Sequence, residues 1–176
     1  RPKPYDSYGN GAAMRISPVA YIATSLADVK KYSRAVTETT HNNIEGIKGA
    51  EAVASAIFLA RSGKTQAEIR DYICHNYYPL NFTLDEIRPT YEFDSSCQGT
   101  VPQAIVAFLE ANSFEDAIRN AISIGGDADT IAAITGSIAE AYFSIPEEIA
   151  EKALLYLDEL QLDILQRFEN FRKVLR

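Results

Sequence analysis

The sequence is poor in cysteine, has no excess of positive charge and contains no long hydrophobic run. Its two cysteines, Cys74 and Cys97, lie outside any CxxC pair, which argues against a disulfide framework and favours a reducing cytoplasm. The formal net charge of −7 argues against a nucleic-acid backbone or an anionic membrane surface as the main partner. The longest mostly apolar stretch, residues 50–60, is far shorter than the ~18 residues that a membrane span needs. We therefore expect a cytoplasmic protein with neither a nucleic-acid surface nor a membrane segment.

Strand signals are also missing. No segment alternates strictly between apolar and polar residues, and no Asn-Gly or Asp-Gly pair separates two strand-like runs. Apolar residues instead recur at helical spacing nearly throughout, most clearly over residues 50–61. The sequence therefore predicts an all-α fold in which short loops join capped helices.

Capping residues predict where the helices begin and end. Capping boxes or looser N-caps are expected for five pairs, which are Thr65 with Glu68, Thr83 with Glu86, Ser144 with Glu147, Ser25 with Asp28 and Ser113 with Asp116. Gly63 is expected to follow the end of a helix, and Pro102 and Pro146 fit first-turn positions. The apolar residues of 154–165 predict a long C-terminal helical region with a break near Gln161.

The segment from Gly125 to Thr130 places two carboxylates and a hydroxyl at the start of a predicted helix. Asp127 and Thr130 can face one point, and the flexible glycine pair can swing Asp129 toward it. Oxygen donors of this kind suit Mg²⁺, Mn²⁺ or Ca²⁺ rather than zinc. Capping of the helix by Asp127 alone also explains the pattern.

Two further segments carry candidate binding residues. Glycines flank Asn10, so consecutive amides of Gly9 to Gly11 could form an anion-binding nest ahead of a helix, although a turn without a ligand fits equally. The dinucleotide pattern GxGxxG fails here, because Met14 stands at its third glycine. His41 follows a predicted helix, where a capping or surface role is the alternative to a catalytic one.

Taken together, these segments resemble the ADP-ribosylglycohydrolase family. The resemblance rests on residues 7–15, Thr40-His41, residues 94–102 and residues 125–130, in this order along the chain. It implies a compact multi-helix orthogonal bundle with a binuclear Mg²⁺ or Mn²⁺ centre in a cleft that holds ADP-ribose. The implied site residues are the metal ligands Asp127, Asp129 and Thr130 and the substrate-binding residues Ser7, Tyr8, Gly9, Asn10, Gly11 and His41.

The implied activity is metal-dependent hydrolysis of the N- or O-glycosidic bond between ADP-ribose and an acceptor. Metal ions would orient the ribose hydroxyls and a water molecule. A carboxylate near the reacting sugar would assist an oxocarbenium-like transition state. His41 would lie near the phosphates.

One feature of the family pattern is missing. Family members carry an N-terminal segment with a Thr-Asp-Asp or Glu-Asp-Asp type motif, which supplies the other metal ligands and an acidic residue near the sugar. Here Arg1 stands just upstream of the substrate loop. We therefore expect residues 1–176 to be the C-terminal portion of a single domain, with half of the metal site. The N-terminal portion is expected to be cleaved, omitted or supplied as a separate chain.

Two functions follow from this interpretation. The first is a hydrolase of ADP-ribosylated substrates that needs its N-terminal portion. The alternative is a catalytically inactive ADP-ribose-binding or structural protein of the same fold. For the hydrolase, the acceptor can be Arg, Ser, an acidic residue, a nucleic-acid base or a free metabolite.

Overall fold

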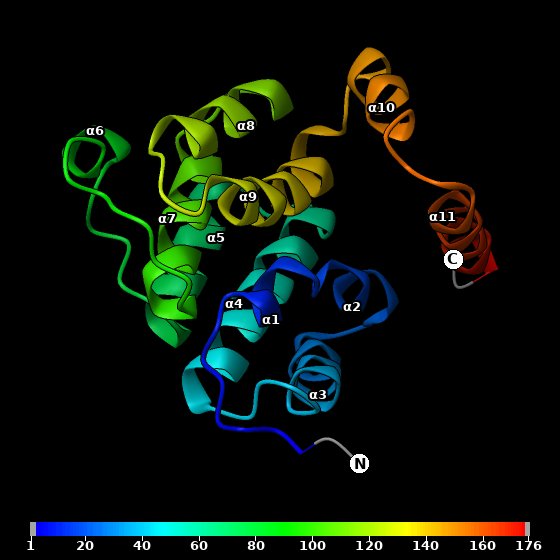
Figure 1. Ribbon diagram of the computed structural model, residues 1–176, viewed down its shortest axis with the longest axis horizontal. Coiled ribbons are helices and arrows are strands. Elements are labelled where there is room, and N and C mark those ends of the chain that lie inside the picture. Colours follow the sequence, from blue (N-terminus) through cyan, green and yellow to red (C-terminus); the bar gives the residue numbers. More distant parts are fainter. Residues whose placement is uncertain (1–2, 175–176) are drawn as a thin grey trace.

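The computed structural model describes residues 3–174, which form eleven α-helices and no β-strand (Figure 1). The predicted all-α fold is confirmed. No helix in this part of the chain is long and apolar enough to cross a membrane. The helices are α1 (Gly11–Met14), α2 (Ser17–Ile22), α3 (Leu26–Thr37), α4 (Ile44–Arg61), α5 (Gln66–Asn76), α6 (Leu84–Ile87), α7 (Cys97–Leu109), α8 (Phe114–Ser123), α9 (Ala128–Phe143), α10 (Glu147–Leu154) and α11 (Glu159–Val174).

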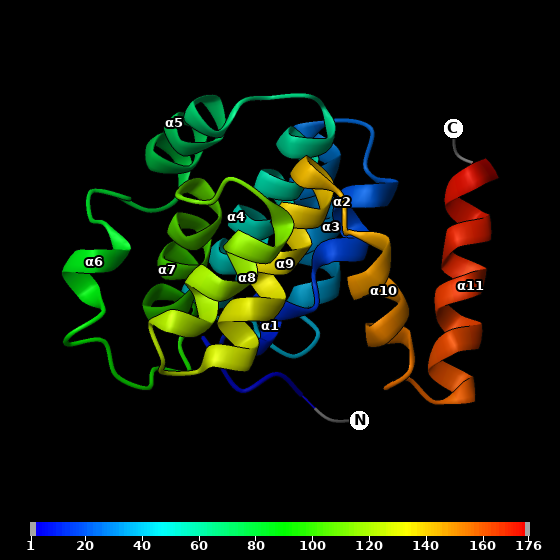
Figure 2. The same ribbon diagram turned by 90° about the horizontal axis from the view of Figure 1, so that it is seen from above.

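Helix α4 lies at the centre of the molecule, in contact with α3, α7 and α9 (Figures 1 and 2). Asn43 caps it by accepting a hydrogen bond from the Glu45 amide at 2.9 Å, and most of its residues are buried. A Cβ atom added to Gly49 would lie 2.6 Å from Cys97 Sγ. Glycine at this position therefore lets α7 begin directly against α4, which brings the start of α7 into the middle of the fold.

Most of the predicted helix ends are confirmed. Gly63, with a φ of 77°, follows the end of α4 in the left-handed conformation that glycine adopts without strain. The confirmed N-caps are Thr65 with Glu68, Thr83 with Glu86, Ser25 with Asp28 and Ser113 with Asp116.

Four predictions about helix ends are wrong: the capping box at Ser144, the first-turn positions of Pro102 and Pro146, and the position of the C-terminal break. Ser144 does not form a capping box with Glu147, because Ser144 ends α9 and Pro146 is the N-cap residue of α10. Pro146 thus precedes the first turn. Pro102 lies inside α7, because Ser96 caps that helix earlier by accepting from the Gly99 amide.

The C-terminal break lies at residues 155–158 rather than near Gln161. Gln161 instead belongs to the first turn of α11. Its amide donates to Asp158 Oδ1 at 2.8 Å, and its side chain accepts from the Asp158 amide at 2.9 Å. This reciprocal pair is a capping box with Asp and Gln in its two positions, and it defines where α11 begins.

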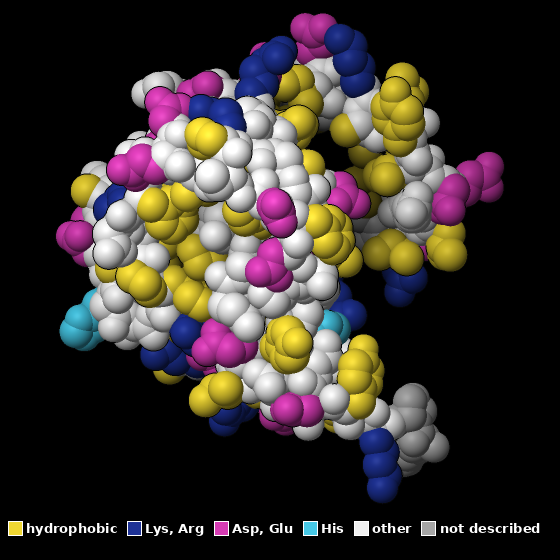
Figure 3. Space-filling view, turned by 60° about the vertical axis from the view of Figure 1, so that its left-hand side comes forward, with side chains coloured by type: hydrophobic (Ala, Val, Ile, Leu, Met, Phe, Trp, Pro, Cys, Tyr) yellow, Lys and Arg dark blue, Asp and Glu magenta, His cyan; other side chains and the backbone are white. Residues whose placement is uncertain are grey.

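Helices α10 and α11 form an arm beside the main body (Figures 1 to 3). Neither helix has a buried residue, and Leu155, Tyr156 and Leu160 are 84%, 89% and 67% exposed. The arm contacts α2 through Tyr21, whose ring meets Phe168 edge-on and lies 4.0 Å from the guanidinium carbon of Arg172. The arm therefore presents much apolar surface that the main body does not cover.

Candidate functional site

A pair of glycines turns the chain into α9 and leaves the Asp127 carboxylate free of that helix. Gly125 and Gly126 have φ values of 74° and 65°. Asp127 stands at the N-cap position, but its side chain makes no capping hydrogen bond. Asp127 therefore occupies the N-cap position of α9 without capping that helix through a side-chain hydrogen bond.

The Asp127 carboxylate is held by Asn10, which comes from the loop before α1. Asn10 Nδ2 donates to Asp127 Oδ2 at 2.6 Å and to Thr100 Oγ1 at 3.0 Å. Thr100 Oγ1 donates its own hydrogen to the Asp94 carbonyl at 2.9 Å. Asn10 is only 7% exposed, so a side-chain amide with both hydrogens paired has one favourable orientation. This chain of bonds ties α1, α7 and α9 together at one point.

Backbone hydrogen bonds fix the 7–11 loop against the start of α7. The Asn10 amide donates to the Ser95 carbonyl at 2.7 Å, and the Cys97 amide donates to the Tyr8 carbonyl at 2.9 Å. These bonds flank the antiparallel bridge between Gly9 and Ser96. The position of the loop is therefore fixed by Ser95 and Cys97, which lie far from it in the sequence.

Of the two alternatives for Gly9 to Gly11, an anion-binding nest and a turn without a ligand, the hydrogen bonds of this loop favour the turn. A nest needs successive free amides, and neither Gly9 nor Gly11 adopts the left-handed conformation that would turn such amides toward one point. The Gly9 amide donates to Ser7 Oγ at 3.3 Å, and the Asn10 amide is taken by Ser95.

Side chains of the same loop line an open hollow of about 330 Å³. Ser7 and Tyr8 contribute to it, with Tyr5, Asp6, Gly9 and Ser95. The Tyr8 residue is 53% exposed. The loop thus offers a ring face and a hydroxyl to a ligand, whereas the Asn10 amide hydrogens are already engaged.

His41 lies over the glycines of this loop. A Cβ atom on either Gly9 or Gly11 would come within 3.5 Å of its Nε2. Its Nδ1 lies 2.8 Å from Thr40 Oγ1 and 3.4 Å from Nη2 of Arg15, which also bonds Thr40. Burial, together with the positive charge of Arg15, lowers the pKa of His41. His41 is therefore a largely neutral imidazole at the edge of the loop at neutral pH.

The predicted metal ligands all lie at the start of α9. Asp129 is exposed and its Oδ1 accepts from the Thr130 amide at 2.9 Å. Thr130 is buried, and its hydroxyl points toward Met14 Sδ at 3.8 Å. Among residues 3–174, no group of three or more His, Cys, Asp and Glu side chains could hold a metal ion. Two carboxylates and one hydroxyl supply fewer than the six oxygen ligands of Mg²⁺.

Sequence reasoning missed the roles of Thr100 and Tyr91. Thr100 pairs with a residue 90 positions away, a relationship that no local pattern reveals. Tyr91 lies against Gly126, where a Cβ atom would come within 2.4 Å of its ring, and its hydroxyl donates to the Gly99 carbonyl at 2.8 Å. Burial raises the pKa of Tyr91 to about 12, so its hydroxyl keeps its proton at neutral pH. In the sequence, only the Gly125-Gly126 pair indicates that another side chain packs closely against this turn.

Replacing Asn10 by Ala should lower the free energy of unfolding by about 1–3 kcal/mol, because two hydrogen bonds are lost in a buried place. Chemical denaturation measures this change. The matched control is Asn81→Ala, at an exposed residue, which should change stability by less than about 0.5 kcal/mol. Equal effects of the two substitutions would show that Asn10 does not hold the site together.

His41 should titrate below the ordinary histidine value of about 6.5, as followed through its ring-proton NMR signals. The Arg15→Gln substitution should raise this pKa, since a nearby positive charge no longer disfavours the imidazolium. The His75→Gln variant assigns the second histidine signal. A His41 midpoint that Arg15→Gln leaves unchanged, or that falls, would contradict the geometry at this edge of the loop.

Known proteins with similar sequences include hydrolases that act on ADP-ribosyl groups. ADP-ribosylhydrolase ARH3 of Bos taurus is 29% identical over a match covering 82% of this chain and 52% of that protein. An uncharacterised protein of Archaeoglobus fulgidus is 31% identical, with 85% and 55% covered. ADP-ribosylarginine hydrolase Tri1 of Pseudomonas putida is 28% identical, with 82% and 42% covered. The chain thus spans about half the length of these relatives.

A solved structure described as an ADP-ribosylglycohydrolase-related protein complex superposes with a TM-score of 0.67 at 26% identity. The superposition covers 82% of this chain and 54% of that one. The family model described as ADP-ribosylglycohydrolase matches residues 1–172. The chain therefore belongs to the ADP-ribosylglycohydrolase family.

Proposed function

We propose that the protein acts in a metal-dependent hydrolase that cleaves the N- or O-glycosidic bond between ADP-ribose and an acceptor. The observation that carries this proposal is the bond from Asn10 to Asp127. It joins the 7–11 loop to a carboxylate that does not cap its own helix. Relatives named ADP-ribosylhydrolase and ADP-ribosylarginine hydrolase support the reaction class.

ADP-ribose is proposed to lie along the 7–11 loop. Ser7 and Tyr8 line the hollow there, and the small Gly9 and Gly11 leave the loop surface open next to His41. Arg15, beside His41, adds a positive charge that suits a diphosphate. Asn10 would contribute by positioning, since its amide hydrogens are committed to Thr100 and Asp127.

Asp127, Asp129 and Thr130 are proposed to bind Mg²⁺ or Mn²⁺. Carboxylate and hydroxyl oxygens are the donors that these hard cations prefer, so the donor chemistry fits. A bound cation would polarise oxygen atoms of the ribose and of a water molecule. The role of this chain is to aim the carboxylate oxygens and to hold the sugar next to them.

The rest of a binuclear ligand set is proposed to come from a further portion of polypeptide, with the catalytic carboxylate. Each of the other adjacent acidic pairs of the described residues has at least one member engaged at a helix start. These contacts include Asp85 with Arg88, Glu86 with Thr83, Glu115 with Arg119, Glu148 with Lys152 and Asp158 with Gln161. The exposed apolar surface of α10 and α11 suits packing against such a portion, whether it is continuous with this chain or separate.

The metal ligands are tested by calorimetric titration of Mn²⁺, in the presence of ADP-ribose, into the protein and its Asp127→Ala, Asp129→Ala double variant. We expect the double variant to lose at least about tenfold in Mn²⁺ affinity, since both carboxylate ligands are removed. The matched control is Glu147→Ala, Glu148→Ala, which removes the same charge at another helix start and should bind like the wild type.

Unchanged Mn²⁺ affinity in the Asp127 and Asp129 variant would contradict the proposed metal site. An equal loss of Mn²⁺ affinity in the Glu147 and Glu148 variant would also contradict it. Such a result would show that the affinity depends on the net charge of the protein and not on Asp127 and Asp129. Activity is then followed as ADP-ribose release from an ADP-ribosylated peptide. Measurable release that proceeds at the same rate in EDTA as in Mg²⁺ would contradict metal dependence.

A further inference from the structure

Helix α11 carries apolar residues on two different faces. Phe168 and Arg172 mark the inner face, because both contact Tyr21 of α2. Leu165 lies one turn before Phe168 on the same face. A second apolar row lies on the side turned away from Tyr21, since each residue of a helix is rotated by about 100° from the one before it. We call this row the outer stripe, and it consists of Leu160, Ile164, Phe171 and Val174, each more than half exposed.

The outer stripe has the spacing of a coiled-coil seam. Counted with Arg167, its residues follow one another at intervals of four, three, four and three positions. This is the heptad spacing by which two helices pack side by side, each inserting its side chains between those of the other. Arg167 is the polar member of the row, and its methylene stem can cover apolar surface while its charged end stays in water. The spacing therefore indicates that the partner of this face is another helix.

The described helices of the main body leave the outer stripe uncovered. In both ribbon views α11 stands at the edge of the molecule (Figures 1 and 2). Hydrophobic side chains are visible along the arm in the space-filling view (Figure 3). Arg167, in the middle of the row, pairs with Asp163 of its own helix at 3.6 Å. The stripe is thus open to a second molecule.

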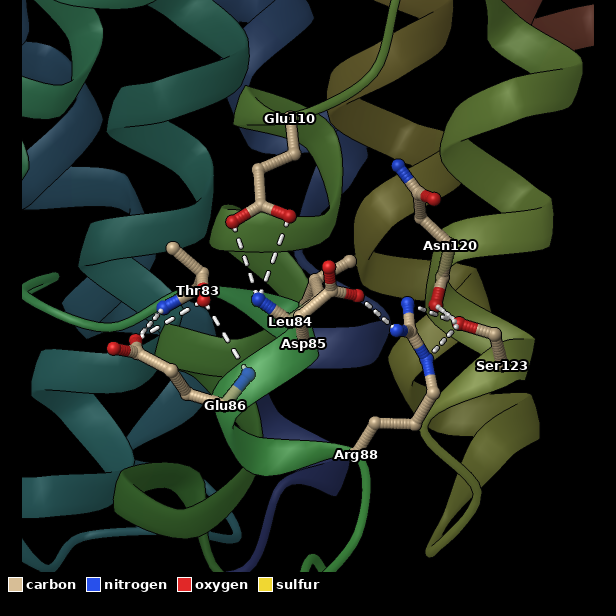
Figure 4. A network of polar contacts seen from close by, with 8 residues as sticks. All are labelled: Thr83, Leu84, Asp85, Glu86, Arg88, Glu110, Asn120 and Ser123. Atoms are coloured by element: carbon tan, nitrogen blue, oxygen red, sulfur yellow. Dashed lines mark hydrogen bonds and ion pairs between the residues drawn. The ribbon is translucent and has the colours of Figure 1, made fainter.

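A peripheral helix of the main body is held differently. Helix α6 is tied to α7, because the Leu84 amide donates to the Glu110 carboxylate at 3.2 Å (Figure 4). It is also tied to α8, because the Arg88 guanidinium donates to Ser123 Oγ at 3.2 and 3.3 Å. Polar side chains of α6 therefore bond to neighbouring helices, whereas Asp163 and Arg167 on the outer side of α11 pair with each other.

Charged residues divide α11 into two halves of opposite sign. The start of the helix is acidic and its second half is mainly basic. The acidic residues are Asp158, Glu159 and Asp163, and the basic ones are Arg167, Arg172 and Lys173, with Glu169 among them. A parallel copy would bring like charges together. An antiparallel copy would place each half against the opposite charge and would also oppose the two helix dipoles. The helix is therefore complementary to a second copy of itself that runs in the opposite direction.

We propose that two copies of the chain associate through the outer stripes of α11, packed antiparallel about a two-fold axis. Both molecules use the same surface in such a contact. Leu160 of one copy would lie against Phe171 of the second copy, and Ile164 against the stem of Arg167 of the second copy. The Arg167 guanidinium would then reach Asp163 of either copy.

This association goes beyond the proposed hydrolysis and does not depend on it. The inner face of α11, with Leu165, and the apolar residues of α10 stay open toward the main body. They remain available to the further portion of polypeptide that is proposed to complete the metal site. The two partners would thus use different faces of the arm.

Sedimentation equilibrium of the whole chain at micromolar concentration tests the association. We expect a species of twice the chain mass. Ile164→Glu and Phe171→Glu should each weaken the association by at least about tenfold, because each places a carboxylate from both copies in an apolar contact. The matched control is Leu165→Glu, which adds the same charge on the inner face of the same helix and should leave the association unchanged. Circular dichroism checks that each variant keeps its helix content.

The direction of the pairing is tested with spin labels at Gln166→Cys and, separately, at Lys173→Cys. Both are made in a Cys74→Ser background, which removes the exposed native thiol. The two positions are one heptad apart and so lie on the same side of the helix. In an antiparallel pair, the two labels at 173 should be separated by about 20 Å more along the helix axis than those at 166. Electron paramagnetic resonance measures both distances.

A monomer at micromolar concentration would overturn the proposal. A dimer that Leu165→Glu weakens as much as Ile164→Glu does would also overturn it, because the contact would not be confined to the outer stripe. Equal label distances at the two positions would contradict the antiparallel arrangement. None of these results bears on Mn²⁺ binding by Asp127 and Asp129, so the proposed hydrolase is judged separately.

Discussion

The side-chain amide of Asn10 is the interaction on which the rest of the site depends. It donates one hydrogen bond to Thr100 of α7 and another to Asp127 at the start of α9. Because the amide is nearly buried, loss of either partner would leave a polar group unsatisfied in the interior. The loop before α1, the start of α7 and the start of α9 are therefore held in one arrangement, and the Asp127 carboxylate is aimed by the fold.

Close backbone approach is the second constraint, and glycine makes it possible. Gly49 lets α7 begin against α4, and Gly126 lets Tyr91 lie under the turn into α9. Gly99 has the same role toward Asp94, since a Cβ atom there would overlap its carboxylate. The hollow beside the 7–11 loop thus adjoins this network of hydrogen bonds, since Ser95 lines the hollow and accepts from the Asn10 amide.

Local chemistry made much of this structure predictable from the sequence. Helix starts at Thr65 and Thr83 were visible because a capping box is a pattern of four neighbouring residues. The start of α10 is mispredicted, because Ser144 and Glu147 match that pattern whereas Pro146 is the N-cap residue of α10. The glycine turn and the Asp127 and Asp129 carboxylates were identified as a candidate site. Their link to Asn10 was not, since it joins residues 117 positions apart.

The central claim is that the start of α9 and the 7–11 loop form one metal and ADP-ribose site. Paramagnetic broadening of backbone amides by Mn²⁺ in the presence of ADP-ribose tests it most directly. We predict that broadening at low Mn²⁺ centres on residues 126–130 and extends to residues 8–11 across the Asn10 to Asp127 bond. Broadening centred on the acidic helix starts at Glu147 or Glu159 instead, with residues 126–130 unaffected, would contradict it.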